Sequence, residues 1–506
     1  MPHGRGRVVL ALAAALAVLA AGTGVVVHDR NRSEDRRDPD RAAAPGAGAP
    51  TPEAVPDPDA AGGGRDDTDD GPGGLVKRLL DALGGGAGGD VTGAALEDCA
   101  SALAAAPVGS AGLLPDRKAG TDPDAQLHQI ADALQGLRML RFERVPVPVY
   151  VTADEMSRRV RAELMRSSSP DETAAEARGL VALGALPPGA DLEALTAEAL
   201  GGQVAGFYDP DTGELVVARS GTSGGLDGQS RIVLAHELDH ALTDQAIGLP
   251  DDVDRPEPGA EDAALGRLAL VEGDATLAMQ QYGLAYVPLL DQLSGLGGAL
   301  ASQEQLARLP DYLQRSLVFP YVAGLSFACA LHRAGGWAAV DAAYRRPPTS
   351  TAQVLFPERY AAHEAPVDPR GPAAPGPGWT PLPRRSFGAA ELRWLLEAPG
   401  GRPDRAVDDA ARRTAGWAGG ELQVWVDGDR TATGVALVQH AGQAPLCATM
   451  AAWYTAAFRG GTRVDRLPGE ELAVDGARQD AVVRCQGDDV RIGIAPDLGT
   501  ARAIAA

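Results

Sequence analysis

The sequence predicts an α+β protein of two or three domains. Its 506 residues are enough to bury a sizeable core. Short β-rich runs bounded by turn residues occur in two separate parts of the chain, at 204–218 and 421–438. Elsewhere apolar residues repeat at helical spacing, most clearly over residues 261–282. Strands grouped in hairpins, with helices grouped apart from them, are typical of α+β folds.

The composition excludes some partners. The formal net charge is −22 and the isoelectric point is about 4.8, so bulk charge does not favour binding to nucleic acid or to anionic lipid. The four cysteines, at positions 99, 329, 447 and 485, form no C-x-x-C pair. A metal site in this chain is therefore not expected to use thiolates, and disulfides are allowed if the chain is exported.

Residues 1–28 are typical of an export signal. Arg5 and Arg7 precede an apolar run over residues 8–27. Small residues at 20–22 would suit a signal peptidase, and cleavage there would leave a secreted protein. The run is also long enough to span a bilayer. We favour an uncleaved anchor in the cell membrane, with the rest of the chain outside the cytoplasm.

Two segments separate this signal from the first β-rich run. Residues 29–73 are rich in Pro, Gly, Asp and Arg and offer almost nothing to bury, which predicts a disordered stalk. Residues 74–144 carry apolar residues at helical spacing, at 75–83, 96–105 and 125–142. They form a helical subdomain or a pro-segment, and the sequence leaves that choice open.

Residues 145–365 are predicted to form the main domain. A β-rich run at 145–151 leads into a capping box that starts a helix over 152–164. A further helix is expected at 191–200.

The two β runs of 204–218, joined by a D-P-D-T-G turn, predict a hairpin. We attribute Asp209 and Asp211 to turn chemistry rather than to calcium binding. A helix over 231–245 follows, so an edge of this sheet is expected to lie beside that helix. Such an edge can hold an extended peptide by main-chain pairing.

The helix over 231–245 contains H-E-x-x-H, formed by His236-Glu237-Leu-Asp-His240. Positions i and i+4 share a helix face, so both imidazoles can bind one Zn²⁺. Glu237 can then take a proton from a zinc-bound water. A chance match is expected in roughly one in a hundred such chains. We expect Ser230 to cap the start of this helix and Gly248 to end it.

A third ligand is expected from the helix over 261–282. Glu272 is the acidic residue in the middle of its apolar face, where a carboxylate is costly unless it is paired or bound to a metal. Pairing with an Arg or Lys is the alternative. Asp244 is a weaker candidate ligand, because it shares a helix with both histidines. No later histidine completes an H-E-x-x-H-x-x-G-x-x-H site, since position 246 is Ala.

The H-E-L-D-H sequence at 236–240, together with L-V-E-G-D-A-T at 270–276, resembles the gluzincins. These are zincin metallopeptidases whose third zinc ligand is a Glu on a later helix. The resemblance implies a zincin-like metallopeptidase domain with a small sheet. It also implies that His236, His240 and Glu272 bind zinc and that Glu237 is the general base.

One position departs from the gluzincin pattern. Gluzincins usually carry an Asp four residues after the Glu ligand, where this chain has Thr276. Asp274 or Asp244 would then have to orient a ligand imidazole. Pieces flanking the zinc motif also resemble exported bacterial proteins of uncharacterised function that are classed as metallopeptidases, and this likeness spans residues 145–460. The pieces lie at 206–215, 319–324, 335–337 and 348–360.

A hydrogen-bond donor usually assists zinc in stabilising the oxyanion. Tyr321, in a Pro-Tyr-x-x-Gly context, is our candidate for this catalytic role. Tyr208, Tyr282 and His332 are the alternatives. His332 lies in an apolar helical stretch, which favours a structural role.

The Pro/Gly-rich residues 366–383 predict a linker to a C-terminal α+β domain over 384–506. Within this domain a helix is expected at 389–397, and a hairpin is expected to turn at Asp427-Gly428. A second helix at 450–458 and a β pair at 481–494 complete it. Cys447 and Cys485 are candidate disulfide partners. These residues offer no catalytic chemistry.

The sequence therefore predicts a zinc metalloendopeptidase acting on protein or peptide substrates outside the cytoplasm. Its expected partners are the substrate and, through the N-terminal segment, the membrane. The alternative is an exported zinc-binding module, a degenerate peptidase used for binding or envelope scaffolding. A third reading is a solute- or wall-binding protein in which the motif is accidental. Metal analysis separates the third reading from the others.

Overall fold

The computed structural model describes residues 9–11, 99, 102–103 and 122–506, with gaps at 168, 202–203, 219–224, 252, 254–255 and 295–303. The predicted stalk at 29–73 lies outside the described residues. So do most of the export signal and most of 74–144. Of the apolar run at 8–27, only the short strand β1 (Val9–Ala11) is described. The described chain is α+β, as the sequence predicts.

A four-stranded sheet supports the first half of the described chain. Its order is β1-β3-β4-β2, with β2 at Pro148–Val151, β3 at Gly206–Asp209 and β4 at Glu214–Ala218. The strands β3 and β4 form the predicted antiparallel hairpin. The Asp209 side chain accepts a hydrogen bond from the Asp211 N–H at 3.0 Å, which confirms the turn chemistry. The strand β2 runs parallel to β4, and β1 runs antiparallel to the outer side of β3.

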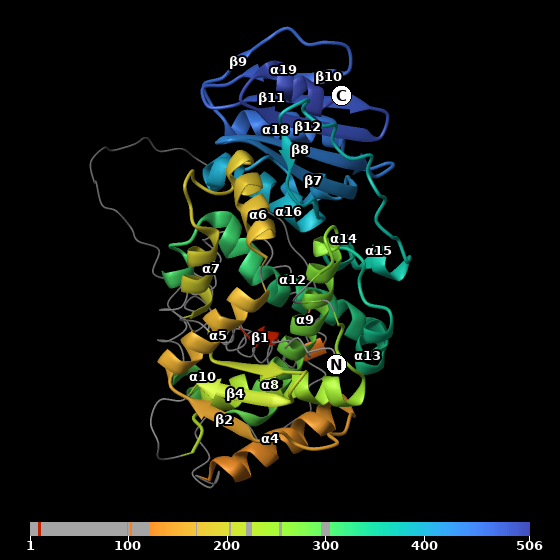
Figure 1. Cartoon of the computed structure of the whole chain (residues 1–506). Coiled ribbons are helices and arrows are strands. Elements are labelled where there is room, and N and C mark those ends of the chain that lie inside the picture. The colour runs from red at the N-terminus through yellow and green to blue at the C-terminus, as the bar shows by residue number, and fades with distance from the viewer. Residues whose placement is uncertain are drawn as a thin grey trace, which may run out of the picture.

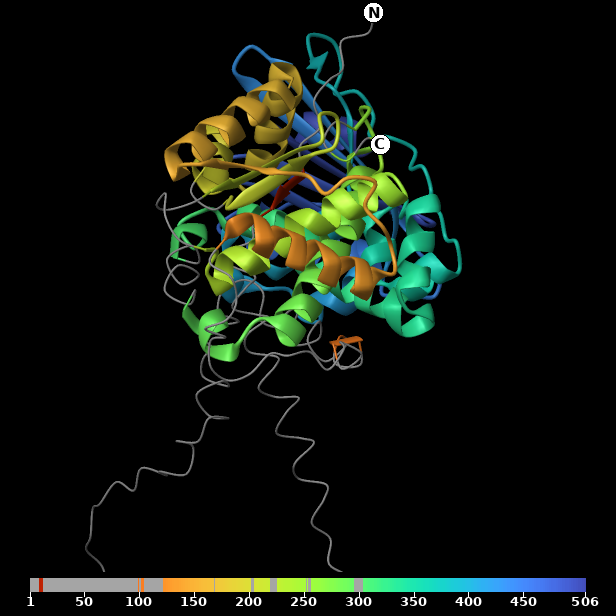
Figure 2. The ribbon, with the colours of Figure 1, turned by 90° about the horizontal axis from the view of Figure 1, so that it is seen from below.

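Four helices precede or interrupt this sheet: α4 (Pro123–Arg138), α5 (Ala153–Ser167), α6 (Pro170–Ala182) and α7 (Leu192–Gly201). The predicted start of α5 is confirmed, because Thr152 Oγ1 accepts the Glu155 N–H at 3.2 Å. Helix α6 is not among the elements predicted from the sequence. Figure 2 shows α4 lying alongside the central helices, and it packs on α8 (Gly228–Ala246).

Helix α8 contains the H-E-x-x-H motif and is buried from Ile232 to Thr243. Its N-cap is Asp227, whose Oδ1 accepts the Ser230 N–H at 2.7 Å. The prediction of Ser230 as N-cap is therefore wrong by three residues. Asp227 provides the same chemistry, because a carboxylate also satisfies the free N–H groups of a first turn. The helix ends before Gly248, whose φ of 92° favours glycine.

Two long helices form the centre of the molecule (Figure 1). They are α9 (Glu261–Tyr286) and α12 (Asp311–Gly335), and they cross at glycines. A Cβ at Gly273 would lie 2.1 Å from the backbone of Gly324. Among the described helices, α12 alone is long and apolar enough to span a bilayer, but 56% of its apolar window is buried inside the protein. It is therefore a core helix.

Shorter helices continue the central layer: α10 (Leu289–Ser294), α13 (Trp337–Arg345), α14 (Thr351–Leu355) and α15 (Pro357–Ala361). A disulfide joins Cys99 to Cys329 of α12, 230 residues later. This bond is not predicted from the sequence. Sequence spacing alone gives no indication of a contact that is made across so long an interval.

The C-terminal part is an eight-stranded antiparallel sheet with helices packed against it, at the top of Figure 1. Its main path runs β5-β7-β8-β12-β11-β10-β9, and β6 pairs with β7 beside it. The strands are β5 (Thr380–Pro381), β6 (Arg385–Ser386), β7 (Trp417–Asp427), β8 (Arg430–Gln439), β9 (Thr462–Arg463), β10 (Glu470–Asp475), β11 (Asp480–Gln486) and β12 (Asp489–Ala495). The β7–β8 hairpin turns at Gly428, as predicted.

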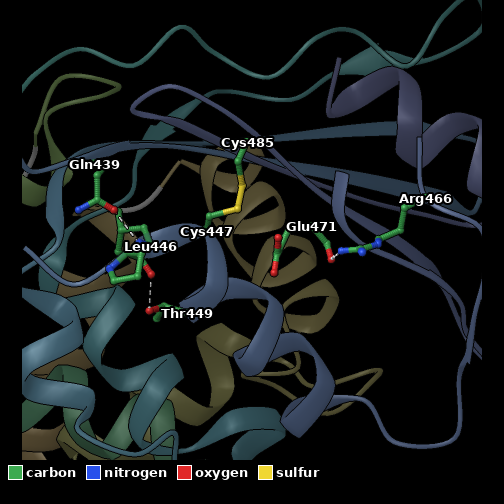
Figure 3. Close-up of a disulfide and its surroundings, with 8 residues drawn as sticks. Gln439, Leu446, Cys447, Thr449, Arg466, Glu471 and Cys485 are labelled. Atoms are coloured by element: carbon green, nitrogen blue, oxygen red, sulfur yellow. Dashed lines mark hydrogen bonds between the residues drawn. A yellow bond between two sulfur atoms is a disulfide. The ribbon is translucent and has the colours of Figure 1, made fainter. Parts of the chain in front are cut away.

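The predicted C-terminal helices are present as α16 (Ala389–Glu397) and α18 (Leu446–Ala457). Additional helices are α17 (Ala410–Thr414) and α19 (Leu498–Ile504). The predicted Cys447–Cys485 disulfide is also present and joins the start of α18 to β11 (Figure 3). Beside it the Gln439 side chain accepts the Leu446 N–H at 2.6 Å, and Arg466 donates to the Glu471 carbonyl at 2.9 Å.

The two parts of the molecule share one hydrophobic core cluster. Polar contacts also join them: the Asp262 N–H of α9 donates to Ser386 Oγ of β6 at 2.8 Å, and Tyr312 of α12 donates to Glu391 of α16 at 2.8 Å. The Pro/Gly-rich residues 366–383 run along the C-terminal sheet, where the Val367 N–H donates to the Ala418 carbonyl. The C-terminal part therefore packs directly on α9 and α12.

Candidate metal centre

Helices α8 and α9 bring His236, His240 and Glu272 together in the core. Their potential ligand atoms all lie within 4.8 Å of one another, and each of the three residues is at most 1% exposed. The two imidazole Nε2 atoms are 3.0 Å apart. Glu272 Oε2 lies 3.1 Å from Nε2 of His236 and 3.5 Å from Nε2 of His240. Three donor atoms thus form a nearly equilateral triangle.

These separations suit a tetrahedral metal ion. Ligand atoms at about 2.0–2.1 Å from a tetrahedral zinc lie about 3.3 Å from one another. Hydrogen bonds alone do not explain the triangle, because an imidazole Nε2 carries at most one hydrogen and directs it along one line. Glu272 Oε1 is buried and has no hydrogen-bond partner among the described residues. The cluster can therefore hold a metal ion, and its donors are two nitrogens and a carboxylate oxygen.

The electrostatics of Glu272 agree with this arrangement. Burial alone would raise the pKa of Glu272, but the two imidazoles lower it below the ordinary value. The carboxylate is therefore held in the charged form that binds metals.

Glu237 lies directly beside the triangle and is 0% exposed. Burial raises the pKa of Glu237 to about 8, while His236 acts in the opposite direction. Neither carboxylate oxygen has a hydrogen-bond partner among the described residues. A cation beside this carboxylate would stabilise its charged form and lower its pKa. Glu237 thus has the free lone pairs that a proton acceptor needs.

Strand β3 passes over Glu237. A Cβ at Gly206 would lie 3.0 Å from Glu237 Cγ and 3.1 Å from its Oε1. Glycine at this position therefore allows the strand to approach the carboxylate closely. The outer edge of β3 pairs with β1, in which Ala11 lies opposite Gly206.

The candidate oxyanion donors lie in different surroundings. Tyr321, on α12, is close to the cluster, with its ring centroid 6.4 Å from that of His236. The Tyr208 hydroxyl donates to Asp244 Oδ2 at 2.9 Å, and the Tyr282 hydroxyl accepts from Arg231 at 3.1 Å. His332 packs edge-on against Trp337, at 5.2 Å between ring centroids. Tyr321 is therefore the candidate that the structure places beside a ligand imidazole.

Asp274 does not take the orienting role considered above. It lies two residues after Glu272, which places it on the other side of α9, and its Oδ2 accepts a hydrogen bond from Tyr344 at 2.7 Å. Its Oδ1 lies 3.0 Å from Nη1 of Arg138. The Nδ1 atom of His236 has no hydrogen-bond partner among the described residues.

Arg138, which the sequence analysis did not single out, is fully buried at the end of α4. Burial alone would lower the pKa of its guanidinium, but the carboxylates around it raise that pKa well above the ordinary value. The group is therefore charged. No local signal could have found it, because an Arg in the last turn of a helix usually caps that helix at the surface.

The fold and the site define an α+β protein with a buried His–His–Glu cluster that can hold a metal ion. The chain matches no protein-family model, no curated protein and no solved structure.

Proposed function

We propose that this protein is a zinc-dependent endopeptidase of the gluzincin type that acts outside the cytoplasm. The observation that carries the proposal is the buried triangle of His236, His240 and Glu272, with the unpartnered carboxylate of Glu237 beside it. Three protein ligands leave a fourth tetrahedral position open, which is typical of catalytic rather than structural zinc sites.

Zinc suits this donor set, because imidazole nitrogen and carboxylate oxygen are both common ligands of this metal. When bound, zinc supplies Lewis-acid chemistry that polarises a peptide carbonyl and makes water a nucleophile near neutral pH. Glu237 accepts the proton that the attacking water loses and then returns a proton to the leaving amine. Tyr321 is the candidate hydrogen-bond donor to the oxyanion.

The arrangement of β3 favours an extended peptide as substrate. The chain itself pairs Val9–Ala11 antiparallel with this edge, so the edge accepts an extended apolar segment. Gly206, which pairs with Ala11 of β1, lies against the Glu237 side chain. A substrate strand in the position of β1 would therefore bring its backbone to the general base. Bound in this way, the peptide is recognised mainly through its main chain.

Two disulfides support an oxidising compartment. Together with the export signal predicted for residues 1–28, they favour action outside the cytoplasm. The N-terminal segment would then leave the edge of β3 and anchor the protein in the cell membrane, or the protein would be secreted if that segment is cleaved.

Two observations favour a second candidate, a zinc-binding module without turnover. Thr276 stands where an orienting Asp is usual, and the Nδ1 atom of His236 has no partner among the described residues. Outer-shell groups of this kind tune both the metal and its ligands. This candidate keeps the metal centre and differs only in lacking peptidase activity.

One experiment separates the two candidates. The zinc content of the purified full-length chain is measured, together with cleavage of an unfolded casein substrate with and without a chelator. A peptidase cleaves casein only in its metal-loaded form, and Glu237→Gln keeps the zinc while losing cleavage. A chain that binds zinc but leaves casein intact is the binding module. A Glu237→Gln variant that still cleaves casein would exclude Glu237 as the general base.

A further inference from the structure

The charge network around Arg138 connects the two helices that carry the metal-binding side chains. Nη1 of Arg138 donates to both carboxylate oxygens of Asp239, at 2.8 and 2.7 Å, and lies 3.0 Å from Asp274. Its Nη2 donates to Asp341 at 2.9 Å. The guanidinium carbon lies 4.3 Å from the centre of the Trp337 ring.

The three carboxylates around Arg138 belong to three different helices. Asp239 is on α8, directly before His240, and Asp274 is on α9, two residues after Glu272. Asp341 is on α13 and adjoins neither of these metal-binding residues. One guanidinium therefore contacts both metal-carrying helices within two residues of a ligand.

We propose that Arg138 is a positioning residue that fixes α8 relative to α9 and so sets the separation of the two imidazoles from the Glu272 carboxylate. This inference rests on the metal centre of the proposed function. It does not depend on turnover, because a zinc-binding module would need the same geometry.

A guanidinium is well suited to this task. It is planar, and it presents several N–H donors in a fixed fork, so its partners are held in direction as well as in distance. Arg138 and Asp239 are at most 1% exposed, so water does not screen their ion pair. Metal–ligand distances tolerate only about 0.2 Å of error. A small slide of α8 along α9 would therefore weaken binding.

The contacts of Arg138 with Asp239 and Asp274 also attach α4 to the two helices that carry the metal-binding residues. Arg138 is the last residue of α4, and this helix also packs on α8 and α9. Removal of residues 123–138 by processing would leave Asp239 and Asp274 buried without their cation, which is strongly destabilising. This part of the predicted segment 74–144 therefore stays with the mature protein.

The test compares zinc affinities of full-length variants. Arg138→Met, Arg138→Lys and Asp239→Asn each disturb the link between α8 and α9, and Asp341→Asn is the matched control. The control removes a carboxylate from the same guanidinium, and its own helix, α13, carries no metal-binding residue. The zinc Kd is measured by competition with a chromophoric chelator. Circular dichroism establishes that each variant is folded at the temperature of the assay.

We expect Arg138→Met and Asp239→Asn to weaken zinc binding by about tenfold or more, in line with other groups that orient metal ligands. Arg138→Lys keeps the charge but lacks the fork, so its Kd should fall between those of Arg138→Met and the wild type. Asp341→Asn should lower the melting temperature yet keep the wild-type Kd. If Arg138→Met does not fold, Arg138→Lys and Asp239→Asn provide the same comparison.

Two results would overturn the inference. In one, the folded Arg138 and Asp239 variants bind zinc with the wild-type Kd. In the other, Asp341→Asn weakens zinc binding as much as Asp239→Asn, which would mean that the network only stabilises the fold. A wild-type chain that binds no zinc refutes the proposed metal centre instead. A chain that binds zinc without cleaving peptides leaves the role of Arg138 intact.

Discussion

Replacing Gly273 by Ala should separate α9 from α12 and destabilise the protein. A Cβ at this position would lie 2.1 Å from both the carbonyl carbon and the carbonyl oxygen of Gly324. Ordinary van der Waals contact begins at 3.4 Å. The backbones would thus have to separate by about 1.3 Å, and no flexible side chain is available to yield.

The expected loss is about 3 kcal/mol in the free energy of unfolding, at the upper end for overpacking of a core. The matched control is Gly283→Ala on the same helix, where a Cβ would meet only Ile232 atoms at 3.9 Å. Alanine is the better helix former by about 1 kcal/mol, so this variant should be as stable as the wild type or more stable. Both free energies come from urea denaturation followed by far-UV circular dichroism.

The position next to Glu272 adds a second readout. Because Gly273→Ala shifts α9, this variant should also bind zinc more weakly than the wild type. The Gly283→Ala variant should keep the wild-type zinc affinity. The reasoning is refuted if Gly273→Ala and Gly283→Ala unfold at the same urea concentration. That result would mean that the space between α9 and α12 at Gly273 can take a Cβ, contrary to the 2.1 Å distance given above.

Three further predictions concern the metal, a buried carboxyl and a disulfide. Glu272→Ala should lower the zinc content measured by atomic absorption and abolish the fall in melting temperature that a chelator causes in the wild type; unchanged zinc content would place the third ligand elsewhere. Burial raises the pKa of Asp262 to about 7 from 3.8, so the folded carboxyl keeps its proton to higher pH than the unfolded one, and its contribution to stability falls as pH rises from about 4 to about 7. The Asn side chain of the Asp262→Asn variant cannot ionise. In denaturation experiments, the free energy of unfolding of this variant should therefore rise relative to that of the wild type by up to about 1.4 kcal/mol per pH unit across that window. A difference in free energy that stays constant with pH would contradict the assignment. Replacing Cys99 by Ala should cost about 5 kcal/mol, because its bond closes a loop of 230 residues, and a loss below about 1 kcal/mol in calorimetry would show that the unfolded chain is not restrained in this way.

The parts of the site that the sequence predicts are those with a local pattern. The spacing of His236 and His240 places both imidazoles on one helix face, and Glu272 is identifiable because a carboxylate stands on an apolar face. The β3–β4 hairpin and the start of α5 follow from turn and capping chemistry within a few residues. In each case the signal lies within a single helix or a single turn.

The remainder depends on contacts between distant residues. Arg138 meets Asp239 across 101 positions, and Gly273 meets Gly324 across the crossing of two helices. Neither residue is unusual in its own segment, since an Arg can end a helix and a Gly occurs in many buried helices. Their roles become visible only when the packing is known, and the same holds for the Asp227 cap, which preceded the expected start of α8.

The bond between Cys99 and Cys329 also orders the events of biogenesis. If the chain is exported in the order of its sequence, Cys99 crosses the membrane long before Cys329, and residues 100–328 must follow before the two sulfurs can meet. His236, His240 and Glu272 all lie inside that interval. In that case the Cys99–Cys329 disulfide can form only after residues 100–328 have been exported. Until then Cys99 has to remain a free thiol. Oxidative closure would be a late step of its maturation, after the ligands can assemble.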